Sequence, residues 1–467
     1  MAILTRFAQA FRTPDLRAKL LFTLGIIVVF RFGSALPAPG ISAASVRYCS
    51  GLETSRGAAM NLYAVLNIFS GNSLLHVTVF ALGIMPYITA SIIVQLLTQV
   101  IPRLQALKDQ DRAGQAKITQ YTRYLTMGLA VIIATGYVQL ARSGTLFPGT
   151  GCSAVSHPLI PGPSVLTIAI MMITMVAGTA VIMWMAELIT DRGIGNGMSV
   201  LIFTSVIAVF FAELEQIYLT RGIPMTVEVV AVVVAVIAFV VFIEQAQRRI
   251  PVQYARRMTG WRVYGGATTY IPVKVNQAGV VPVIFASSML AIPQLAASLL
   301  GNQNSPQGWV AWVDRYLVPG ARVLPVYYLA FFALIIAFAY FYTSITFNPA
   351  EVADNTRKYG GFVPGLRPGA PTASYLGYVV TRLTAPGAVY LAVIALLPMV
   401  ALGMIGIGSQ ALFSGVSLLI MVGVGLDTVK QVESQLQQHH YEGFLRGPAR
   451  PAGTVGTPEA PAALTVS

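Results

Sequence analysis

The chain of 467 residues is too apolar to be a soluble protein. Hydrophobic residues make up 55% of it and charged residues only 10%, and its mean hydropathy is +0.70. A soluble protein of this length needs far more polar surface. The composition, together with a net charge of +13, indicates a basic polytopic membrane protein.

Ten apolar segments are long enough to cross a hydrocarbon core of about 30 Å, which takes roughly 20 residues of helix. The predicted fold class is therefore an all-α membrane protein with ten transmembrane helices. In chain order the spans lie near residues 20–38, 76–100, 121–141, 164–189, 196–214, 226–245, 276–299, 323–346, 376–400 and 410–430. Segment 1–19 is amphipathic and lacks an apolar core followed by a cleavage site, so we expect the first span to insert as a helix and not as a removable signal peptide.

The positive charges predict the orientation of these spans. If the N-terminus is cytoplasmic, 23 of the 30 Lys and Arg fall on cytoplasmic segments, six fall on external loops, and Arg31 lies inside the first span. This distribution is the positive-inside bias, so we expect both termini in the cytoplasm. The cytoplasmic tail would be 431–467, and from about residue 447 its Pro-, Ala- and Gly-rich composition is typical of disorder.

The spans divide into two equal groups. Five spans (20–214) precede an expected external hinge loop at 215–225, and five (226–430) follow it. Because five is odd, the two halves have opposite topologies. Such an arrangement suggests an inverted repeat, which usually places the working site between the halves near the membrane midplane.

One cytoplasmic connection is strongly basic. The stretch from Gln247 to Lys274 has no acidic residue, and its cations are Arg248, Arg249, Arg256, Arg257, Arg262 and Lys274. A basic hairpin between two spans is suited to docking a polyanion, although its charges also help to fix the topology.

Motifs of enzymes are missing from the sequence. There is no Gly-Lys-Ser/Thr phosphate loop, no His-Glu-x-x-His pair and no Ser/His/Asp set, so we expect neither an enzyme nor a cofactor or metal. The run Gly193-Ile-Gly-Asn-Gly197 offers either an anion nest or, as we favour, a tight cytoplasmic turn.

A channel and a small-solute secondary carrier with an inverted-repeat fold both remain open at this point. An ion-coupled carrier normally keeps a carboxylate near mid-membrane. Here the acidic residues of the spans lie near helix ends, and they are Glu187, Glu213, Glu215, Glu244 and Asp427. Their positions favour the channel.

Nine sequence motifs follow one another along the chain. They are Asn67–Gly71, Phe80–Ile88, Ser91–Leu97, Lys117–Tyr124, Asp191–Ser199, Gln247–Ile250, Lys274–Gly279, Phe347–Asn355 and Phe362–Gly369. Together they resemble the motifs of the SecY family, the pore subunits of the bacterial protein translocase. The resemblance is collinear from about Leu16 to Phe444.

The resemblance implies a protein-conducting channel without enzymatic activity of its own. It would pass unfolded secretory proteins across the bacterial plasma membrane and release membrane-protein helices laterally. A motor ATPase, the ribosome or the proton-motive force would supply the energy. The implied partners are the SecE and SecG subunits, the SecA motor, the ribosome with its RNA, signal peptides, nascent chains and lipids.

The resemblance also implies four functional sets in a clamshell of two halves. The pore waist would be Ile84, Ile88, Met198, Ile202, Ile284 and Ile420. A plug at about 62–75 would include Leu62, Asn67, Phe69, Ser70 and Gly71. The lateral gate between the second and seventh spans would include Thr89, Ile92, Asn276 and Ser288. The docking surface, in loops 246–275 and 347–374, would include Arg248, Arg249, Arg256, Arg257, Arg357, Lys358 and Arg367.

Each set has a plainer alternative: apolar packing for the waist, an external loop for the plug, helix packing for the gate and topology for the cations. Two places also depart from the family pattern. Phe413-Ser-Gly-Val-Ser417 replaces Phe-Gly-Gly-Thr-Ser, and Gly71-Asn-Ser73 replaces Gly-Gly-Ala. A specialised accessory paralogue therefore stays open as an alternative.

The two cysteines of the chain, Cys49 and Cys152, both fall in expected external loops. A disulfide is permitted there, but the sequence does not show whether the two residues pair.

Overall fold

The structure is a computed structural model. It describes residues 13–46, 48–49, 70–71, 73, 76–108, 110–143, 159–162, 164–254, 257–259, 262–264, 268–300, 308–317, 325–404 and 415–445.

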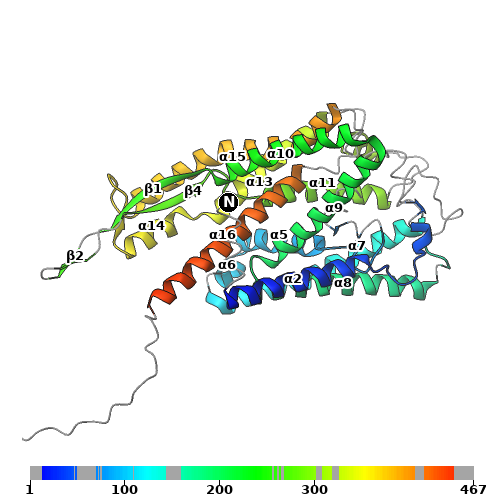
Figure 1. The fold of residues 1–467 in the computed structure, drawn as a ribbon, viewed down its shortest axis with the longest axis horizontal. Coiled ribbons are helices and arrows are strands. Elements are labelled where there is room, and N and C mark those ends of the chain that lie inside the picture. The colour runs from blue at the N-terminus through cyan, green and yellow to red at the C-terminus, as the bar shows by residue number, and fades with distance from the viewer. Residues whose placement is uncertain are drawn as a thin grey trace, which may run out of the picture.

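Long helices dominate the fold (Figure 1). The first half contains α2 (Pro14–Ala35), α5 (Met85–Val100), α6 (Pro102–Lys108), α7 (Asp111–Ser143), α8 (Val165–Arg192) and α9 (Gly197–Arg221). The second half contains α10 (Ile223–Gln245), α11 (Val281–Leu300), α12 (Trp309–Tyr316), α13 (Pro325–Thr346), α14 (Pro349–Lys358), α15 (Ala370–Met404) and α16 (Gly415–Leu445). Every predicted span overlaps one of these helices.

The helices confirm a multi-pass membrane protein. Among the described residues, seven helices are long and apolar enough to cross a membrane alone: α2, α8, α9, α10, α13, α15 and α16. Helices α5 and α6 also qualify as one pair, bent by 106°. The remaining predicted spans correspond to α7, whose first turns are polar, and to α11, so the total of ten stays a prediction.

Two segments differ from the sequence-based expectation. The expected hinge loop at 215–225 is mostly helical, because α9 continues to Arg221 and α10 begins at Ile223. The break is Gly222 alone, whose φ of +79° suits glycine, and Pro224 follows in the first turn of α10. The second predicted span also starts later than expected, since residues 76–84 form turns before α5.

Helices α9 and α16 join the two halves. In Figure 1, α10, α13 and α15 lie above α2, α7 and α8, and α9 and α16 cross obliquely between the two groups. Helix α9 contacts both α10 and α16. The largest buried apolar cluster draws on both halves and includes Leu201 and Val206 of α9 and Leu418 and Leu419 of α16.

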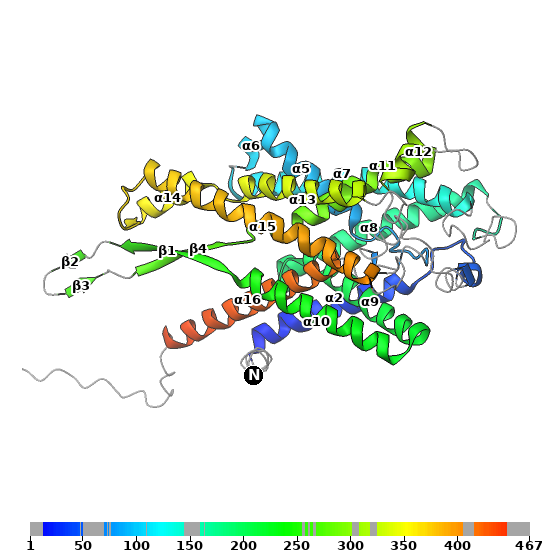
Figure 2. The same ribbon diagram turned by 90° about the horizontal axis from the view of Figure 1, so that it is seen from above.

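The basic stretch forms the predicted hairpin and acquires a third strand. β1 (Gln247–Tyr254) pairs antiparallel with β4 (Thr268–Lys274), and β5 (Gly361–Phe362) pairs with the other edge of β1. A short ribbon of β2 (Arg257–Thr259) and β3 (Arg262–Tyr264) extends the hairpin away from the helices (Figure 2). The two loops 246–275 and 347–374 are thus parts of one body.

An apolar face attaches this sheet to the helices. Ile250, Val252 and Val273 pack with Ala353 of α14 and Leu376 of α15 in a separate buried cluster. Strand β1 alternates between these buried positions and exposed ones, as expected for a sheet with one solvated face. The hairpin is therefore packed against helices of the second half.

The segment before α5 is held against the end of α2. The Val79 amide donates to the Leu36 carbonyl over 3.0 Å, and the Ala38 amide donates to the Val77 carbonyl over 3.0 Å. Phe80 stacks on Phe30 of α2 with ring centroids 6.0 Å apart. These contacts satisfy the buried backbone of a non-helical segment, which is tolerated at membrane depth only inside protein.

The first half carries a disulfide near the carboxyl-terminal end of α7. Cys49 is fully buried and disulfide-bonded, and it packs with Leu159, Ile160, the last turns of α7 and the first turns of α8. The sequence has one other cysteine, Cys152, which lies outside the described residues.

We predict that Gly178→Ala in α8 destabilises the protein, whereas Gly128→Ala in α7 does not. A Cβ at Gly178 would collide with the backbone carbonyl of Val79, whereas a Cβ at Gly128 would meet nothing within 4 Å. The first change forces the fixed segment away from α8, and the second gains about 0.5–1 kcal/mol of helix propensity. Thermal unfolding in detergent measures both. Equal stabilities of the two variants would contradict this close packing.

Candidate functional site

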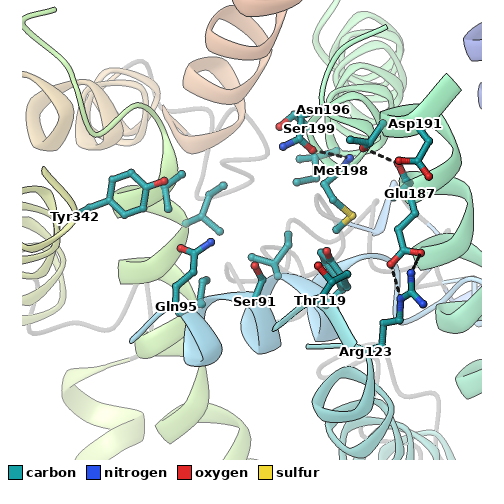
Figure 3. A pocket seen from close by; sticks show the side chains of 18 residues that line it. Ser91, Gln95, Thr119, Arg123, Glu187, Asp191, Asn196, Met198, Ser199 and Tyr342 are labelled. Carbon is teal, nitrogen blue, oxygen red and sulfur yellow. Dashed lines mark hydrogen bonds and ion pairs between the residues drawn. The ribbon is translucent and has the colours of Figure 1, made fainter. Parts of the chain in front are cut away.

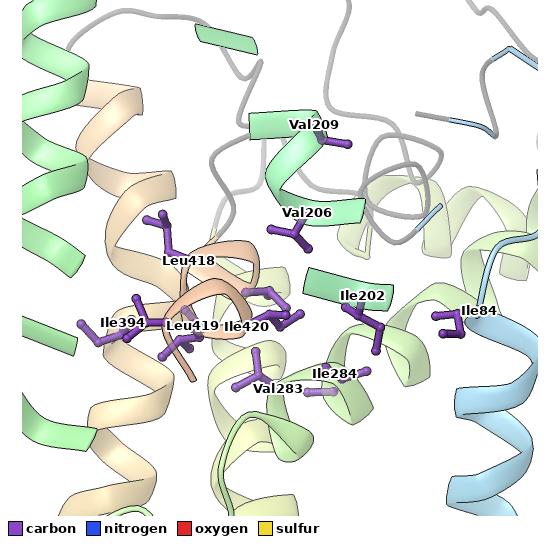
Figure 4. Close-up of a cluster of buried hydrophobic side chains, with 14 of the residues drawn as sticks. Ile84, Ile202, Val206, Val209, Val283, Ile284, Ile394, Leu418, Leu419 and Ile420 are labelled. Carbon is purple, nitrogen blue, oxygen red and sulfur yellow. The ribbon is translucent and has the colours of Figure 1, made fainter. Parts of the chain in front are cut away.

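The six predicted waist residues come together in the structure. Four are buried, with exposed fractions of 3% for Ile84, 7% for Ile202, 8% for Ile284 and 1% for Ile420. Ile88 and Met198 are partly buried and pack against the same cluster. Figure 4 shows Ile202, Ile284 and Ile420 close together between α9, α11 and α16, with Ile84 facing them from α5. The site therefore lies where the two halves meet.

Helix starts position these side chains. Ile84 is the N-cap of α5, and Ile88 follows one turn later, its amide bonded to the Ile84 carbonyl over 3.1 Å. The others lie in the first two turns of α9, α11 and α16. Along α9, Ile202, Val206 and Val209 recur at spacings of four and three residues, which places them on one helix face, as Figure 4 shows.

The Gly193–Gly197 run is the tight turn that the sequence favoured. It connects α8 to α9, with Gly193 as the C-cap of one helix and Asn196 as the N-cap of the other. The Ile194 amide donates to the Thr23 hydroxyl over 3.2 Å, and the Gly197 amide donates to the Thr190 hydroxyl over 2.9 Å. Because these amides already have partners, the structure favours the tight turn over the anion nest.

A cavity of about 500 Å³ adjoins the waist. Ile88, Met198, Ile202 and Ile284 form part of its wall. Side chains of α5, α7, α8, α9, α11 and α13 line it, so it opens between the two halves. Its polar lining includes Ser91, Gln95, Thr119, Asp191 and Tyr342 (Figure 3).

One ion pair holds the wall of this cavity. Arg123 of α7 donates two hydrogen bonds to Glu187 of α8, from Nε to Oε1 over 2.8 Å and from Nη2 to Oε2 over 2.7 Å. The paired fork fixes the orientation of both side chains. It also joins α7 to α8 near the end where the Gly193–Gly197 turn lies.

Of the four predicted gate residues, only Ile92 lines the cavity. Ile92 lies on α5, where the Thr89 hydroxyl donates to the Met85 carbonyl of its own helix over 3.0 Å. On α11, the Ser288 hydroxyl is buried and has no hydrogen-bond partner among the described residues. Asn276 forms its hydrogen bonds within the second half: its side-chain amide donates to the Glu244 carboxylate over 3.0 Å and to the Gly279 carbonyl over 3.2 Å.

Only part of the predicted plug can be placed. Leu62, Asn67 and Phe69 lie outside the described residues. Ser70 is buried, and Gly71, with φ +66°, lies between Arg31 of α2 and Ser205 of α9. The motif at 413–417, which differs from the family pattern, lies at the start of α16. Its residues Val416 and Ser417 are buried in the first turn of that helix.

The predicted docking cations share the sheet end of the molecule. Arg248 and Arg249 on β1, Arg357 and Lys358 on α14, and Arg367 are all exposed. Among the described residues none of the five forms an ion pair with an acid. Lys274 does, with 3.8 Å between its Nζ and Asp427 Oδ1. Arg256 lies outside the described residues, and for Arg257 the structure describes the backbone only.

One acidic residue has surroundings that the sequence did not predict. Glu213 is 5% exposed, and neither carboxylate oxygen has a hydrogen-bond partner among the described residues. It follows Ile202, Val206 and Val209 on the same face of α9 at a spacing of four residues. The sequence placed Glu213 near the end of its span, whereas α9 continues to Arg221; the spacing from Val209 was the available signal for its burial.

The comparisons with known proteins agree with this geometry. A family model of SecY matches residues 78–429. The chain belongs to the SecY family. It is 56% identical over 448 residues to the protein translocase subunit SecY of Streptomyces scabiei, a match that covers 95% of this chain and 100% of that relative.

Solved channels of the SecY family share the fold. One is a SecY structure whose plug domain stabilises the closed state of the translocation channel and maintains a membrane seal. It matches with a TM-score of 0.59 and 17% identity over 92% of this chain and 94% of that one. The other is Sec61 in the canine ribosome-channel complex from the endoplasmic reticulum, with a TM-score of 0.56 and 16% identity over 92% and 94%.

We predict that Glu213→Met stabilises the folded protein. A buried carboxyl group without partners costs roughly 1–3 kcal/mol, and a thioether of similar size removes that cost. Glu215 is exposed on the same helix, so Glu215→Met should change the free energy of unfolding by less than about 0.5 kcal/mol. Thermal unfolding of both variants in detergent distinguishes them. A Glu213 variant less stable than the parent would mean that the carboxyl group has a partner.

Proposed function

We propose that this protein is the protein-conducting channel of a Sec translocase, through which unfolded secretory proteins cross the membrane. The observation that carries the proposal is the apolar waist, formed by both halves and placed next to a cavity. It is supported by membership of the SecY family, whose relative in Streptomyces scabiei is a protein translocase subunit. The channel also releases membrane-protein helices sideways into lipid.

The waist seals the resting channel against ions. Branched apolar side chains at a constriction exclude water by dewetting. They offer no fixed hydrogen bonds, so an extended polypeptide of any sequence displaces them without breaking specific contacts. Ile84, Ile202, Ile284 and Ile420 supply the closed seal, and Ile88 and Met198 extend it toward the cavity.

The lateral gate is the seam between α5 and α11. Each helix packs mainly within its own half, α5 against α7 and α11 against α13. The cavity already separates them on one side, with Ile92 on α5 and Ile284 on α11 in its wall. Small or polar side chains such as Thr89 and Ser288 let helices meet without a permanent apolar contact.

The plug, at about 62–75, closes the outer funnel when the channel is idle. A signal sequence opens the channel by stabilising the open state relative to this closed one. The position of Gly71 beside α9, on which Ile202 lies, supports the placement of the plug next to the waist.

The exposed cations of the sheet end form the docking surface for the ribosome and the SecA motor. Arginine suits ribosomal RNA because its planar fork binds phosphate in a bidentate manner. We place this surface, both termini and the Gly193–Gly197 turn in the cytoplasm and the protein in the bacterial plasma membrane. SecE and SecG complete the complex, and energy comes from the motor, from translation or from the proton-motive force, since the channel itself catalyses no reaction.

The function is tested by crosslinking a translocating chain to the waist. A photoreactive amino acid at position 88 should crosslink a stalled secretory protein in the assembled translocase. The same probe at position 132 should not, because Ile132 is 67% exposed on α7, where we expect lipid. Equal crosslinking at the two positions, or none at position 88, would contradict passage through the waist.

We predict that Arg248→Gln with Arg249→Gln weakens ribosome binding in a salt-dependent manner. Removing two phosphate-binding cations lowers the slope of log affinity against log salt by roughly 2. The control is Lys108→Gln with Lys117→Gln, which removes two exposed cations of α6 and α7. Binding titrations of the purified translocase at several salt concentrations measure the slope. If both pairs lower it equally, general charge and not the sheet determines docking.

A further inference from the structure

One cation lies inside the first membrane span. Arg31 is in the last turns of α2 (Pro14–Ala35), a helix apolar enough to cross the membrane. Charged side chains at this depth are costly and usually serve a function, with a partner that can be identified. None of the four functional sets above uses Arg31.

The observed partner of Arg31 is the backbone at Gly71. The Arg31 Nη1 group donates to the Gly71 carbonyl over 3.4 Å. The chain passes through a narrow space here, because a Cβ at Gly71 would come within 3.2 Å of Arg31 Nη1 on one side and within 3.2 Å of Ser205 Cα on the other. Gly71 therefore lies between α2 and α9, the guanidinium group forming one wall.

The chain that follows Gly71 is fixed to α2. The Ser73 hydroxyl donates to the Ser34 carbonyl over 3.4 Å, and the Thr78 hydroxyl donates to the Ser73 carbonyl over 3.3 Å. Val77, fully buried, has φ +49°, a strained conformation for a β-branched residue that persists only where its surroundings impose it. Beyond it, the Val79 and Ala38 bonds attach the segment to the end of α2.

Gly71 is thus the junction between a fixed segment and the proposed plug. Downstream residues are bonded to α2, and upstream residues lead into 62–69. Ser205, the other wall, lies one turn after Ile202 on the α9 face of the waist. The contact between Arg31 and Gly71 therefore lies next to α9. A change in the position of the plug would alter the packing against this helix, which carries Ile202.

We propose that Arg31 is a positioning residue that holds the carboxyl-terminal end of the plug at Gly71 in the closed channel. This inference rests on the proposed plug. A guanidinium group in a low-dielectric site gains more from a carbonyl than it would in water, so losing this contact favours plug displacement. Arg31 then contributes to the closed state that a signal sequence must overcome.

The competing role for Arg31 is an interaction with lipid headgroups. Long cationic side chains near helix ends extend toward the interface, and such a role would be independent of the plug. The two roles differ in one measurable property, namely whether the effect of changing Arg31 disappears when the plug is removed.

The experiment is a double-variant cycle in the assembled translocase. Arg31→Met, replacement of 62–69 by a Gly-Ser linker of the same length, and the combination are each measured for ion conductance of the idle channel in planar bilayers. Export of a substrate with a crippled signal sequence is measured in cells. The control is Arg142→Met, which removes an exposed cation at the end of α7 that we also expect to be external.

We expect Arg31→Met to raise both idle conductance and export of the crippled substrate, and Arg142→Met to change neither. In the linker background Arg31→Met should add nothing, because residues acting as a unit are not additive. The role of Arg31 is overturned, and the plug assignment is not, if the effects of Arg31→Met and the linker are additive. The same holds if the linker variant raises the idle conductance and Arg31→Met does not. If the linker variant leaves the idle conductance and the export unchanged, the plug assignment is wrong and this inference fails with it.

A second variant disturbs the contact between Arg31 and Gly71 without changing Arg31. Gly71→Ala places a Cβ against the guanidinium group and Ser205 and strains a residue at φ +66°. It should reproduce the leak in the parent channel and add nothing in the linker background. If Arg31→Met does not accumulate in the membrane, this variant decides the question by the same criteria.

Discussion

Apolar packing between α9 and α16 is the interaction on which the architecture depends. These two helices belong to different halves and contribute Leu201, Val206, Leu418 and Ile420 to one buried cluster. Dispersion and hydrophobic contacts are non-directional, so two such surfaces can slide or separate and then close again without finding a unique set of hydrogen-bond partners. A channel that opens for polypeptides of many sequences needs an interface that can separate and close again in this way.

Polar side chains inside the spans are mostly satisfied within their own helices. The hydroxyls of Thr126, Thr179, Thr343 and Thr384 each donate to the carbonyl four residues earlier. A hydroxyl that bonds to its own helix in this way can lie within the hydrocarbon core, because it needs no hydrogen-bond partner on a neighbouring helix. The polar contacts that do cross between helices, such as Arg123 with Glu187, mark places where the relative position of two helices is fixed.

The periodicity of the sequence was sufficient for elements whose causes are local. The apolar runs predicted the helices, the acid-free stretch predicted the β1–β4 hairpin, and the glycines at 193–197 predicted a turn. The motifs named the waist residues, and the structure places them in one cluster. Pairing of β1 with Gly361–Phe362 could not be read from the sequence, because a two-residue strand far along the chain has no periodic signature.

Errors arose where tertiary contacts override local pattern. Polar residues at 215–221 suggested a loop, yet α9 continues through them until Gly222. Residues 76–84 are apolar enough for helix, but their amides and carbonyls bond to the end of α2. The burial of Glu213 and the contact of Arg31 with Gly71 depend on neighbours that only the folded chain brings close.

The three-stranded sheet has a mechanical consequence. Its central strand leaves α10, its neighbour β4 leads into α11, and β5 lies between α14 and α15. A force applied at its tip is therefore distributed over several helices of one half, through backbone hydrogen bonds and the buried Ile250 and Leu376. No described strand of this sheet comes from the first half. The sheet is attached to one half only, so a torque applied to it acts across the contact between the two halves.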